Sequence, residues 1–172
     1  NSDGGGSTID YVFQKVAQGI RYAVQIGAQV INMSLSYATS GISSLVVQDV
    51  QDAILEAHTA GVVVVVAAGN NNSSTWFYTP ASMENVITVS ATDSEDLRAT
   101  YMGSYFSNYG YGVDLAAPGA NIYSTYINTT YGTGYKYEYG TSMSAPFVTG
   151  LAALLLAQDP SATEADVFRR MK

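Results

Sequence analysis

The sequence contains no cysteine among its 172 residues, which excludes a disulfide framework and any thiolate metal site. Positive charge is also scarce, because 7 Lys and Arg residues stand against 14 Asp and Glu residues and the net charge is −7. Proteins that bind nucleic acids carry clustered Lys and Arg, so we expect no nucleic-acid partner. Histidine is nearly absent as well, and His58 is the only one.

Long hydrophobic runs are missing too. The run at 62–68 is the length of a strand and far short of a membrane span. Charged residues make up 12% of the chain and apolar residues 47%, as in a globular domain with a sizeable core. Few charges and many small polar residues suit a secreted or extracellular enzyme, and this is the localisation that we expect.

The spacing of the apolar residues predicts alternating helices and strands. Helices are expected at 9–26, at 45–60, at 142–157 and from 162 onward. Strands are expected at 30–35, 62–67, 86–91 and 113–116. A hairpin of 122–127 and 135–139 is expected to turn around Gly132 and Gly134.

The expected strand at 62–67 consists of five valines and an alanine, so both of its faces are apolar. Strands of this kind lie in parallel sheets that helices cover on both sides. The sequence therefore predicts an α/β fold, a three-layer sandwich with a mainly parallel sheet. Ligands bind such sheets beyond the carboxyl ends of the strands. Chemistry is therefore expected at 34–36, at Gly69 and Asn70, and at the start of the helix near Ser142.

The segment 140–146 reads Gly-Thr-Ser-Met-Ser-Ala-Pro and leads into a strongly apolar helix. Free backbone N–H groups and the dipole at a helix N-terminus favour negative charge, which suits a serine nucleophile whose attack creates an oxyanion. Ser142 is therefore a candidate nucleophile; the alternative is an ordinary helix N-cap, a position that Ser and Thr favour. Ser144 stands where a G-x-S-x-G elbow has its last glycine, which argues against an α/β-hydrolase.

Small residues follow the valine strand. Ala67, Ala68 and Gly69 leave room for a ligand, and the side-chain amide of Asn70 is able to donate a hydrogen bond to an oxyanion. The alternative is an ordinary asparagine at a strand-to-turn boundary. The sequence has neither a G-x-G-x-x-G motif nor a P-loop, so a nucleotide-binding α/β protein is not supported.

Five blocks, in this order along the chain, resemble the subtilisin family of serine proteases. They are 30–35, 61–70, 80–82 with 85–87, 117–119 and 140–146. The resemblance covers nearly the whole chain, and its Gly-Thr-Ser-Met block is highly specific. It implies a subtilisin-like fold truncated at the N-terminal side, so that 1–172 forms a partial peptidase domain with the nucleophile and oxyanion-hole portions.

The resemblance implies that the complete protein is a serine endopeptidase acting through an acyl-enzyme on Ser142. The side-chain amide of Asn70 and the backbone N–H of Ser142 then form the oxyanion hole. The implied substrate-binding residues are Gly4, Gly5, Gly6, Ser34, Leu35, Ser36, Ala67, Ala68 and Gly69. The first two triplets flank an extended peptide, and the third lines the pocket for the side chain before the scissile bond. The Thr79–Pro80 peptide bond is expected to be cis.

The family's catalytic aspartate and histidine lie upstream of the region that this chain matches, and no Asp-Thr-Gly or His-Gly-Thr-His block is present. His58 stands at the wrong place in the motif order and is expected to face solvent near the end of a helix. Without a base a serine hydroxyl is a poor nucleophile, so the chain alone is expected to be inactive. The alternative function is a non-catalytic pseudoprotease or peptide-binding domain.

Two kinds of partner follow from the resemblance. One is a peptide or protein substrate, and the other is the missing N-terminal segment that carries the catalytic Asp and His. Without that segment the strand at 30–35 is expected to lie on an unpaired sheet edge, through which the chain is expected to associate with other chains.

Two departures from the family pattern bear on the site. Ser36 stands where the family has glycine, so we expect a narrower entry to the pocket. Phe147 replaces a structural histidine, so we expect a packing change only.

No cofactor is expected to be required. The resemblance implies a weak calcium or sodium site formed by Asp114 and the carbonyl groups of Ala81, Met83 and Val86. Gly112 replaces one acidic ligand of the family, so strong binding is not expected.

Overall fold

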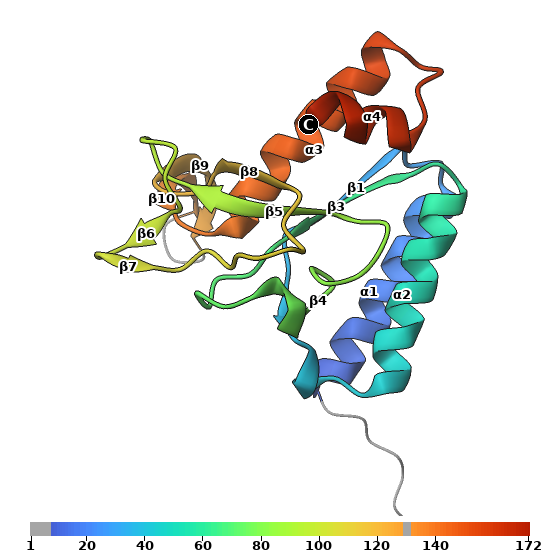
Figure 1. Cartoon of the computed structure of the whole chain (residues 1–172), viewed down its shortest axis with the longest axis horizontal. Coiled ribbons are helices and arrows are strands. Elements are labelled where there is room, and N and C mark those ends of the chain that lie inside the picture. Colours follow the sequence, from blue (N-terminus) through green and yellow to red (C-terminus); the bar gives the residue numbers. More distant parts are fainter. Residues whose placement is uncertain (1–7, 129–131) are drawn as a thin grey trace, which may run out of the picture.

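A parallel four-stranded sheet forms the centre of the molecule (Figure 1). The computed structural model describes residues 8–128 and 132–172. The strands of this sheet are β1 (Val30–Met33), β3 (Val63–Ala67), β5 (Ile87–Thr92) and β8 (Leu115–Pro118). They lie in the order β1-β3-β5-β8, and each neighbouring pair is parallel. The predicted α/β fold is thereby confirmed.

Helices cover both faces of the sheet. α1 (Thr8–Gln25) and α2 (Ser44–Thr59) pack on one face, and α3 (Thr141–Gln158) and α4 (Glu164–Met171) on the other (Figure 1). Buried residues recur every three or four positions along the first two helices: Phe13, Ala17 and Ile20, then Val46, Val50, Ala53, Ile54 and Ala57. This spacing gives each helix one apolar stripe toward the sheet.

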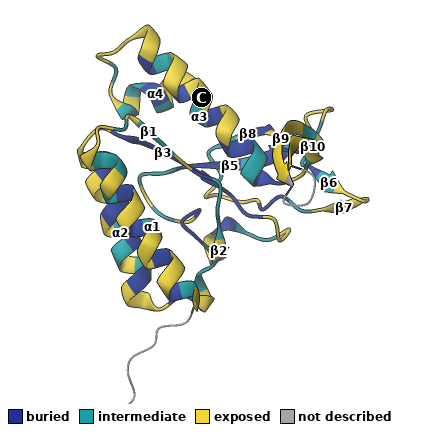
Figure 2. Ribbon diagram, turned by 180° about the vertical axis from the view of Figure 1, so that it is seen from behind, coloured by how far each residue is buried: buried dark blue, intermediate teal, exposed yellow. Residues whose placement is uncertain are grey.

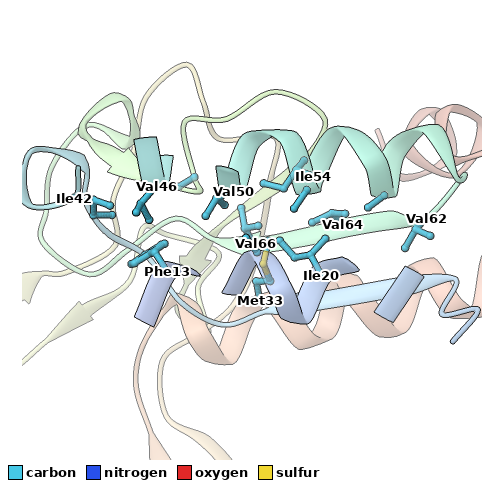
Figure 3. Close-up of a cluster of buried hydrophobic side chains, with 14 residues drawn as sticks. Phe13, Ile20, Met33, Ile42, Val46, Val50, Ile54, Val62, Val64 and Val66 are labelled. Atoms are coloured by element: carbon cyan, nitrogen blue, oxygen red, sulfur yellow. The ribbon is translucent and has the colours of Figure 1, made fainter. Parts of the chain in front are cut away.

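The valine strand connects the two cores. Successive side chains of a strand point to opposite faces of the sheet. Val64 and Val66 accordingly belong to the cluster beneath α1 and α2, together with Val62 just before the strand (Figure 3). Val63 and Val65 belong to the cluster beneath α3 and α4. All five side chains are buried, which explains why this segment shows no polar alternation.

α3 is the most apolar helix in the described part of the chain. It has 18 residues and is apolar enough, by length and composition alone, to cross a membrane. Its buried residues instead pack on the sheet, among them Ala145, Val148, Ala152 and Leu156. Such packing is typical of the core helix of a globular domain.

α4 begins with a capping box, in which Thr163 and Asp166 satisfy each other's backbone N–H groups.

The remaining strands form two-stranded ribbons. β2 (Tyr37–Ala38) pairs with β4 (Tyr78–Thr79), β6 (Thr100–Tyr101) with β7 (Ser104–Tyr105), and β9 (Ile122–Asn128) with β10 (Gly132–Glu138). Gly132 and Gly134 lie within β10, opposite Asn128 and Tyr126, so the expectation that they form the turn was wrong. The Thr79–Pro80 bond is cis, as expected.

One edge of the sheet and one face of α3 have no cover in the described part of the chain. β1 pairs with β3 on one side only. Phe147, Leu151 and Leu154 recur along α3 and are 50%, 42% and 69% exposed. Figure 2 shows this helix with long exposed stretches, although its other side is buried against the sheet.

Candidate active site

The carboxyl ends of β1 and β3 meet the start of α3. The sheet register pairs Met33 with Val66, so the segments that follow the two strands lie side by side. Asn70, after β3, forms hydrogen bonds with Thr141, the first residue of α3, and Ser34, after β1, forms hydrogen bonds with the second, Ser142. Three segments that are remote in the sequence therefore bring Ser34, Asn70 and Ser142 together, as the sheet topology led us to expect.

Asn70 is held by its amide oxygen. Its Oδ1 accepts hydrogen bonds from the backbone N–H of Thr141 (2.9 Å) and from the Thr141 hydroxyl (3.0 Å). The same hydroxyl accepts a bond from the Gly69 N–H (3.0 Å). A backbone N–H only donates, so this network identifies which amide atom is the oxygen. Within residues 8–128 and 132–172 no protein acceptor is recorded for Nδ2, which leaves its two N–H donors available to a ligand.

Gly140 keeps the space beside that amide open. It precedes α3 with φ 149°, a backbone conformation that residues with a side chain rarely adopt. A Cβ at this position would lie 3.2 Å from Nδ2 of Asn70. Glycine is therefore required here both by the backbone and by the donor next to it.

Ser142 exchanges two hydrogen bonds with Ser34. Its Oγ donates to the Ser34 carbonyl oxygen (3.0 Å), and the Ser34 hydroxyl donates to the Ser142 carbonyl oxygen (2.9 Å). The second bond replaces a missing helix bond, because Pro146 has no N–H to offer to the carbonyl four residues before it. Asn32 supports the pair: its Nδ2 donates to the Ser34 hydroxyl oxygen (2.9 Å), and its Oδ1 accepts from the Thr149 hydroxyl (2.9 Å).

The backbone N–H of Ser142 is a second donor at this helix N-terminus. The N–H groups on either side are engaged, that of Thr141 with Asn70 Oδ1 and that of Met143 with the Gly140 carbonyl (3.0 Å). For the Ser142 N–H the described chain offers no recorded acceptor. Free N–H groups and the helix dipole attract negative charge. The start of α3 therefore presents the hydroxyl of Ser142, its own N–H and the Asn70 amide together.

Small buried residues line the adjoining end of β3. Ala67, Ala68 and Gly69 are all buried. Gly69 has φ 102°, and a Cβ there would lie 2.4 Å from Asn108 Nδ2 and 3.2 Å from Ser36 Oγ. The Ser36 hydroxyl is itself buried and has no partner among the described residues. Ser36 therefore lies beside Gly69 at the end of β3, which is the place where we expected its side chain to narrow the pocket.

Of the two segments expected to flank a substrate, the structure describes 34–36 but not 4–6. β1 ends at Met33, one residue before the 34–36 segment, so the predicted strand to 35 is too long. No strand is assigned at 34–36 in the described chain, and Leu35 packs partly against the core. Gly4, Gly5 and Gly6 lie outside the described residues, and their role stays a prediction.

Comparison with known proteins identifies the family. A family model described as the subtilase family matches residues 5–172. The chain belongs to the subtilase family. Thermitase from Thermoactinomyces vulgaris is 45% identical over 148 residues, which cover 86% of this chain and 47% of thermitase. Subtilisin DY from Bacillus licheniformis is 38% identical over 174 residues, which cover 99% of this chain and 56% of that protein.

A solved structure gives the same result. A protease from Pseudoalteromonas arctica PAMC 21717 superposes with a TM-score of 0.79 at 36% identity. The superposition covers 90% of this subtilase chain and 49% of the other chain. The chain thus spans about half the length of the relatives that it matches here.

The tyrosine-rich hairpin of β9 and β10 lies beside the candidate site. A depression of 540 Å³ lies between this hairpin and α3, with Tyr123 and Tyr126 on one side and Ser142 and Phe147 on the other. The Lys136 ammonium lies 3.6 Å from the centre of the Tyr126 ring, a cation–π contact. Phe147 is half exposed and lines this depression, and the expectation that it brings a packing change only stays a prediction.

His58 belongs to a different part of the subtilase chain. Its Nδ1 lies 2.9 Å from Glu164 Oε2, without hydrogen-bond geometry, and the side chain lines a separate depression with Asp114. Its side chain is 41% exposed, in agreement with the expectation that it lies near solvent, although α4 covers its Nδ1. No base contacts Ser142 in the described chain; its hydroxyl donates to a carbonyl oxygen instead.

The four residues expected to bind an ion line one depression of 430 Å³: Ala81, Met83, Val86 and Asp114. The Asp114 carboxylate already accepts the Thr88 N–H (3.0 Å) and lies 3.6 Å from Lys172 Nζ. The Ala81 carbonyl already accepts the Thr88 hydroxyl (2.9 Å). Among the described residues no group of three or more His, Cys, Asp or Glu side chains is placed to hold a metal. This donor set does not fit a tightly bound calcium, and a weak ion stays a prediction.

Thr141, Asn32 and Asn108 surround the site, yet sequence reasoning gave none of them a role. Thr141 lies inside the Gly-Thr-Ser-Met block, and this position was the one sequence signal that pointed to it as a partner of Asn70. Asn32 and Asn108 offered no local signal: Asn32 lies between two apolar residues of an expected strand, and Asn108 lies in a polar stretch where an asparagine normally marks a turn.

Proposed function

We propose that the complete subtilase is a serine endopeptidase whose nucleophile is Ser142. One observation carries the proposal: Thr141 fixes the oxygen of the Asn70 amide, which leaves the amide N–H groups free beside the N-terminus of the helix that carries Ser142. A preorganised donor of this kind is what an oxyanion intermediate requires.

The chemistry proceeds in two stages. Ser142 Oγ transfers its proton to a general base and bonds to the carbonyl carbon of the scissile peptide. The carbonyl oxygen becomes an oxyanion and accepts hydrogen bonds from Asn70 Nδ2 and the Ser142 N–H. Collapse breaks the C–N bond, the base protonates the leaving amine, and Ser142 remains as an ester. Water, deprotonated by the same base, hydrolyses the ester and restores the hydroxyl.

The proposed substrate is an extended peptide. It lies along 34–36, a segment with no strand assigned to it in the described chain. When the Ser142 proton turns toward a base, the Ser34 carbonyl is released from its present hydrogen bond and becomes an acceptor for substrate. Ala67, Ala68 and Gly69 form the wall of the pocket for the side chain before the scissile bond.

We also propose that the general base comes from a further segment that docks on β1 and α3. The described chain has one histidine, and that residue contacts α4. β1 has one described neighbour in the sheet, and three apolar side chains of α3 are exposed. Full burial of each such side chain contributes about 1.5–3 kcal/mol. The relatives are about twice as long as the match, so they have chain enough to cover this surface.

A fluorophosphonate probe tests the catalytic proposal. The complete protein is expected to react at Ser142, and Ser142→Ala is expected to abolish the reaction. The 172-residue chain alone is expected not to react, because no base accepts the Ser142 proton. Rapid labelling of the chain alone would show that a base has been missed. A complete protein that neither reacts with the probe nor hydrolyses peptides would favour the alternative function, a pseudoprotease that binds peptides.

Light scattering of the chain alone at micromolar concentration tests the docking surface. We expect association, or a co-purifying peptide that mass spectrometry detects. Leu154→Gln should weaken association, whereas Leu45→Gln, at an 83% exposed position on α2, serves as the matched control. A monomer with a cooperative melt and no second peptide would refute the proposed docking surface.

Secretion of the complete protein stays a prediction.

A further inference from the structure

The buried side chain of Asn108 binds the backbone of the loop that carries Asn70. We propose that Asn108 is a positioning residue that sets the place of the oxyanion donor. The inference rests on the proposed function, since it assigns to Asn108 an effect on the reaction of Ser142 through Asn70.

Asn108 binds the loop on both sides of Asn70. Its Oδ1 accepts the N–H groups of Asn71 (3.0 Å) and Ser73 (3.0 Å), which follow Asn70. Its Nδ2 donates to the carbonyl of Ala68 (2.9 Å), which precedes Asn70, and its own N–H donates to the Gly69 carbonyl (2.9 Å). The side chain is fully buried, at 0% exposure, so these bonds form away from water.

The hydrogen bonds that the side chain of residue 108 makes to this loop require an asparagine. The three side-chain bonds need an oxygen that accepts twice and an adjacent group that donates. In a buried place a missing partner leaves a polar backbone group unsatisfied, which is costly. Gly69 matches this arrangement, because a Cβ on it would lie 2.4 Å from Asn108 Nδ2. The open side of Gly69 is thus filled by the Asn108 amide.

Other bonds keep the loop in the fold if Asn108 is truncated. The Asn72 N–H donates to the Phe106 carbonyl (2.8 Å), and the Tyr109 N–H donates to the Ser73 carbonyl (3.0 Å). The Thr141 bonds also continue to hold the Asn70 amide oxygen. Truncation should therefore loosen the backbone around Asn70 without releasing the loop. A misplacement of about 1 Å in a catalytic group lowers rates by up to about a hundredfold.

Kinetics of the complete subtilase test the proposal. Asn108→Ala should lower kcat by about ten- to a hundredfold and leave KM within about twofold. Thr88→Val is the matched control: Thr88 is equally buried, but its hydroxyl donates to the Ala81 carbonyl (2.9 Å) and forms no recorded bond with Asn108 or with the loop in the described chain. This control should lower the melting temperature and leave kcat unchanged. An unchanged kcat in Asn108→Ala would overturn the proposal.

A double mutant separates positioning from a general loss of structure. If Asn108 acts through Asn70, adding Asn108→Ala to Asn70→Ala should lower kcat by no more than about twofold further. A full multiplicative loss would overturn the proposal. If Asn108→Ala does not fold, Asn108→Asp keeps the acceptor and loses the bond to the Ala68 carbonyl, and its kcat should still fall several-fold. Wild-type kcat in that variant would count against the proposal.

Hydrogen exchange provides a readout that does not depend on activity. In Asn108→Ala the amides of Asn71 and Ser73 should exchange faster, while the Thr75 amide, which donates to the Tyr109 carbonyl (2.9 Å), should be unchanged. Unchanged exchange rates at Asn71 and Ser73 would refute the proposal that Asn108 holds this loop in place. An inactive wild type would instead refute the proposed function in the labelling experiment, and the catalytic role of Asn108 with it.

Discussion

Asn70 has two contacts with different consequences, and two substitutions should separate them. Its Nδ2 is the proposed donor to the oxyanion, whereas its Oδ1 accepts the N–H and hydroxyl of Thr141 at the start of α3. Asn70→Ala removes both functions. Asn70→Asp keeps an oxygen for Thr141 and replaces the donor with a second oxygen.

The magnitudes follow from these contacts. Loss of one oxyanion donor costs about a hundred- to a thousandfold in kcat, or about 3–4 kcal/mol. Loss of the Oδ1 acceptor costs about 1 kcal/mol of stability, at the low end for two bonds because Asn70 is exposed and water replaces it. Asn70→Ala should therefore lose kcat and melt a few degrees lower. Asn70→Asp should melt near wild type yet lose at least as much kcat, because its carboxylate repels the oxyanion.

Steady-state kinetics with a chromogenic peptide and thermal melts of the complete protein provide the assay. KM should change little in either variant, because the oxyanion exists only in the transition state and the intermediate. A defect confined to KM would remove Asn70 from the oxyanion hole. Wild-type activity in Asn70→Asp would also contradict the reasoning, since that variant has no side-chain donor at neutral pH.

Two further predictions concern pocket size and acid stability. Ser36→Gly removes a buried hydroxyl that has no partner among the described residues. The value of kcat/KM should therefore rise for substrates with a large side chain before the scissile bond and change less for substrates with alanine there. Equal effects on both kinds of substrate would refute a role of Ser36 in the pocket. Hydrogen bonds from Thr163 and Arg169 hold the pKa of Asp166 at about 2, below its ordinary value of 3.8. This stabilisation is present above the unfolded pKa and is lost as pH falls toward the folded one, so the gap in Tm between wild type and Asp166→Asn should shrink between pH about 5 and about 2.5.

The sequence was sufficient for the layers of the fold. Its valine segment predicted a strand buried on both faces, and Val64 and Val65 do point into different cores. Helix positions followed from the spacing of apolar residues, which is a local property. Strand ends were less accurate, since β1 stops at Met33 and the next residues are held by α3 instead of by a strand.

The contacts that make the site were beyond the sequence. Asn70 and Thr141 are 71 positions apart, and Ser34 and Ser142 are 108 apart. These pairs meet because β1 and β3 are neighbours and both end at the N-terminus of α3, and the order of strands in a sheet has no local signal. The position of the hairpin turn failed for a physical reason: glycine marks turns, yet an exposed ribbon tolerates Gly132 and Gly134. The contact of His58 with Glu164 joins residues over a hundred positions apart, so it too had no local signal.

The structure separates the two halves of the proposed catalytic machinery. The oxyanion half is complete without a base: Thr141 orients Asn70, Gly140 leaves its donor open, and Asn108 fastens its loop. The Ser142 hydroxyl, in contrast, donates to the Ser34 carbonyl, a group that cannot take its proton. Binding an oxyanion and activating the hydroxyl are therefore distinct physical tasks in this fold. A segment that supplies a base has only to draw one proton away from Ser34, because the proposed oxyanion donors, Asn70 Nδ2 and the Ser142 N–H, already lie at the start of α3.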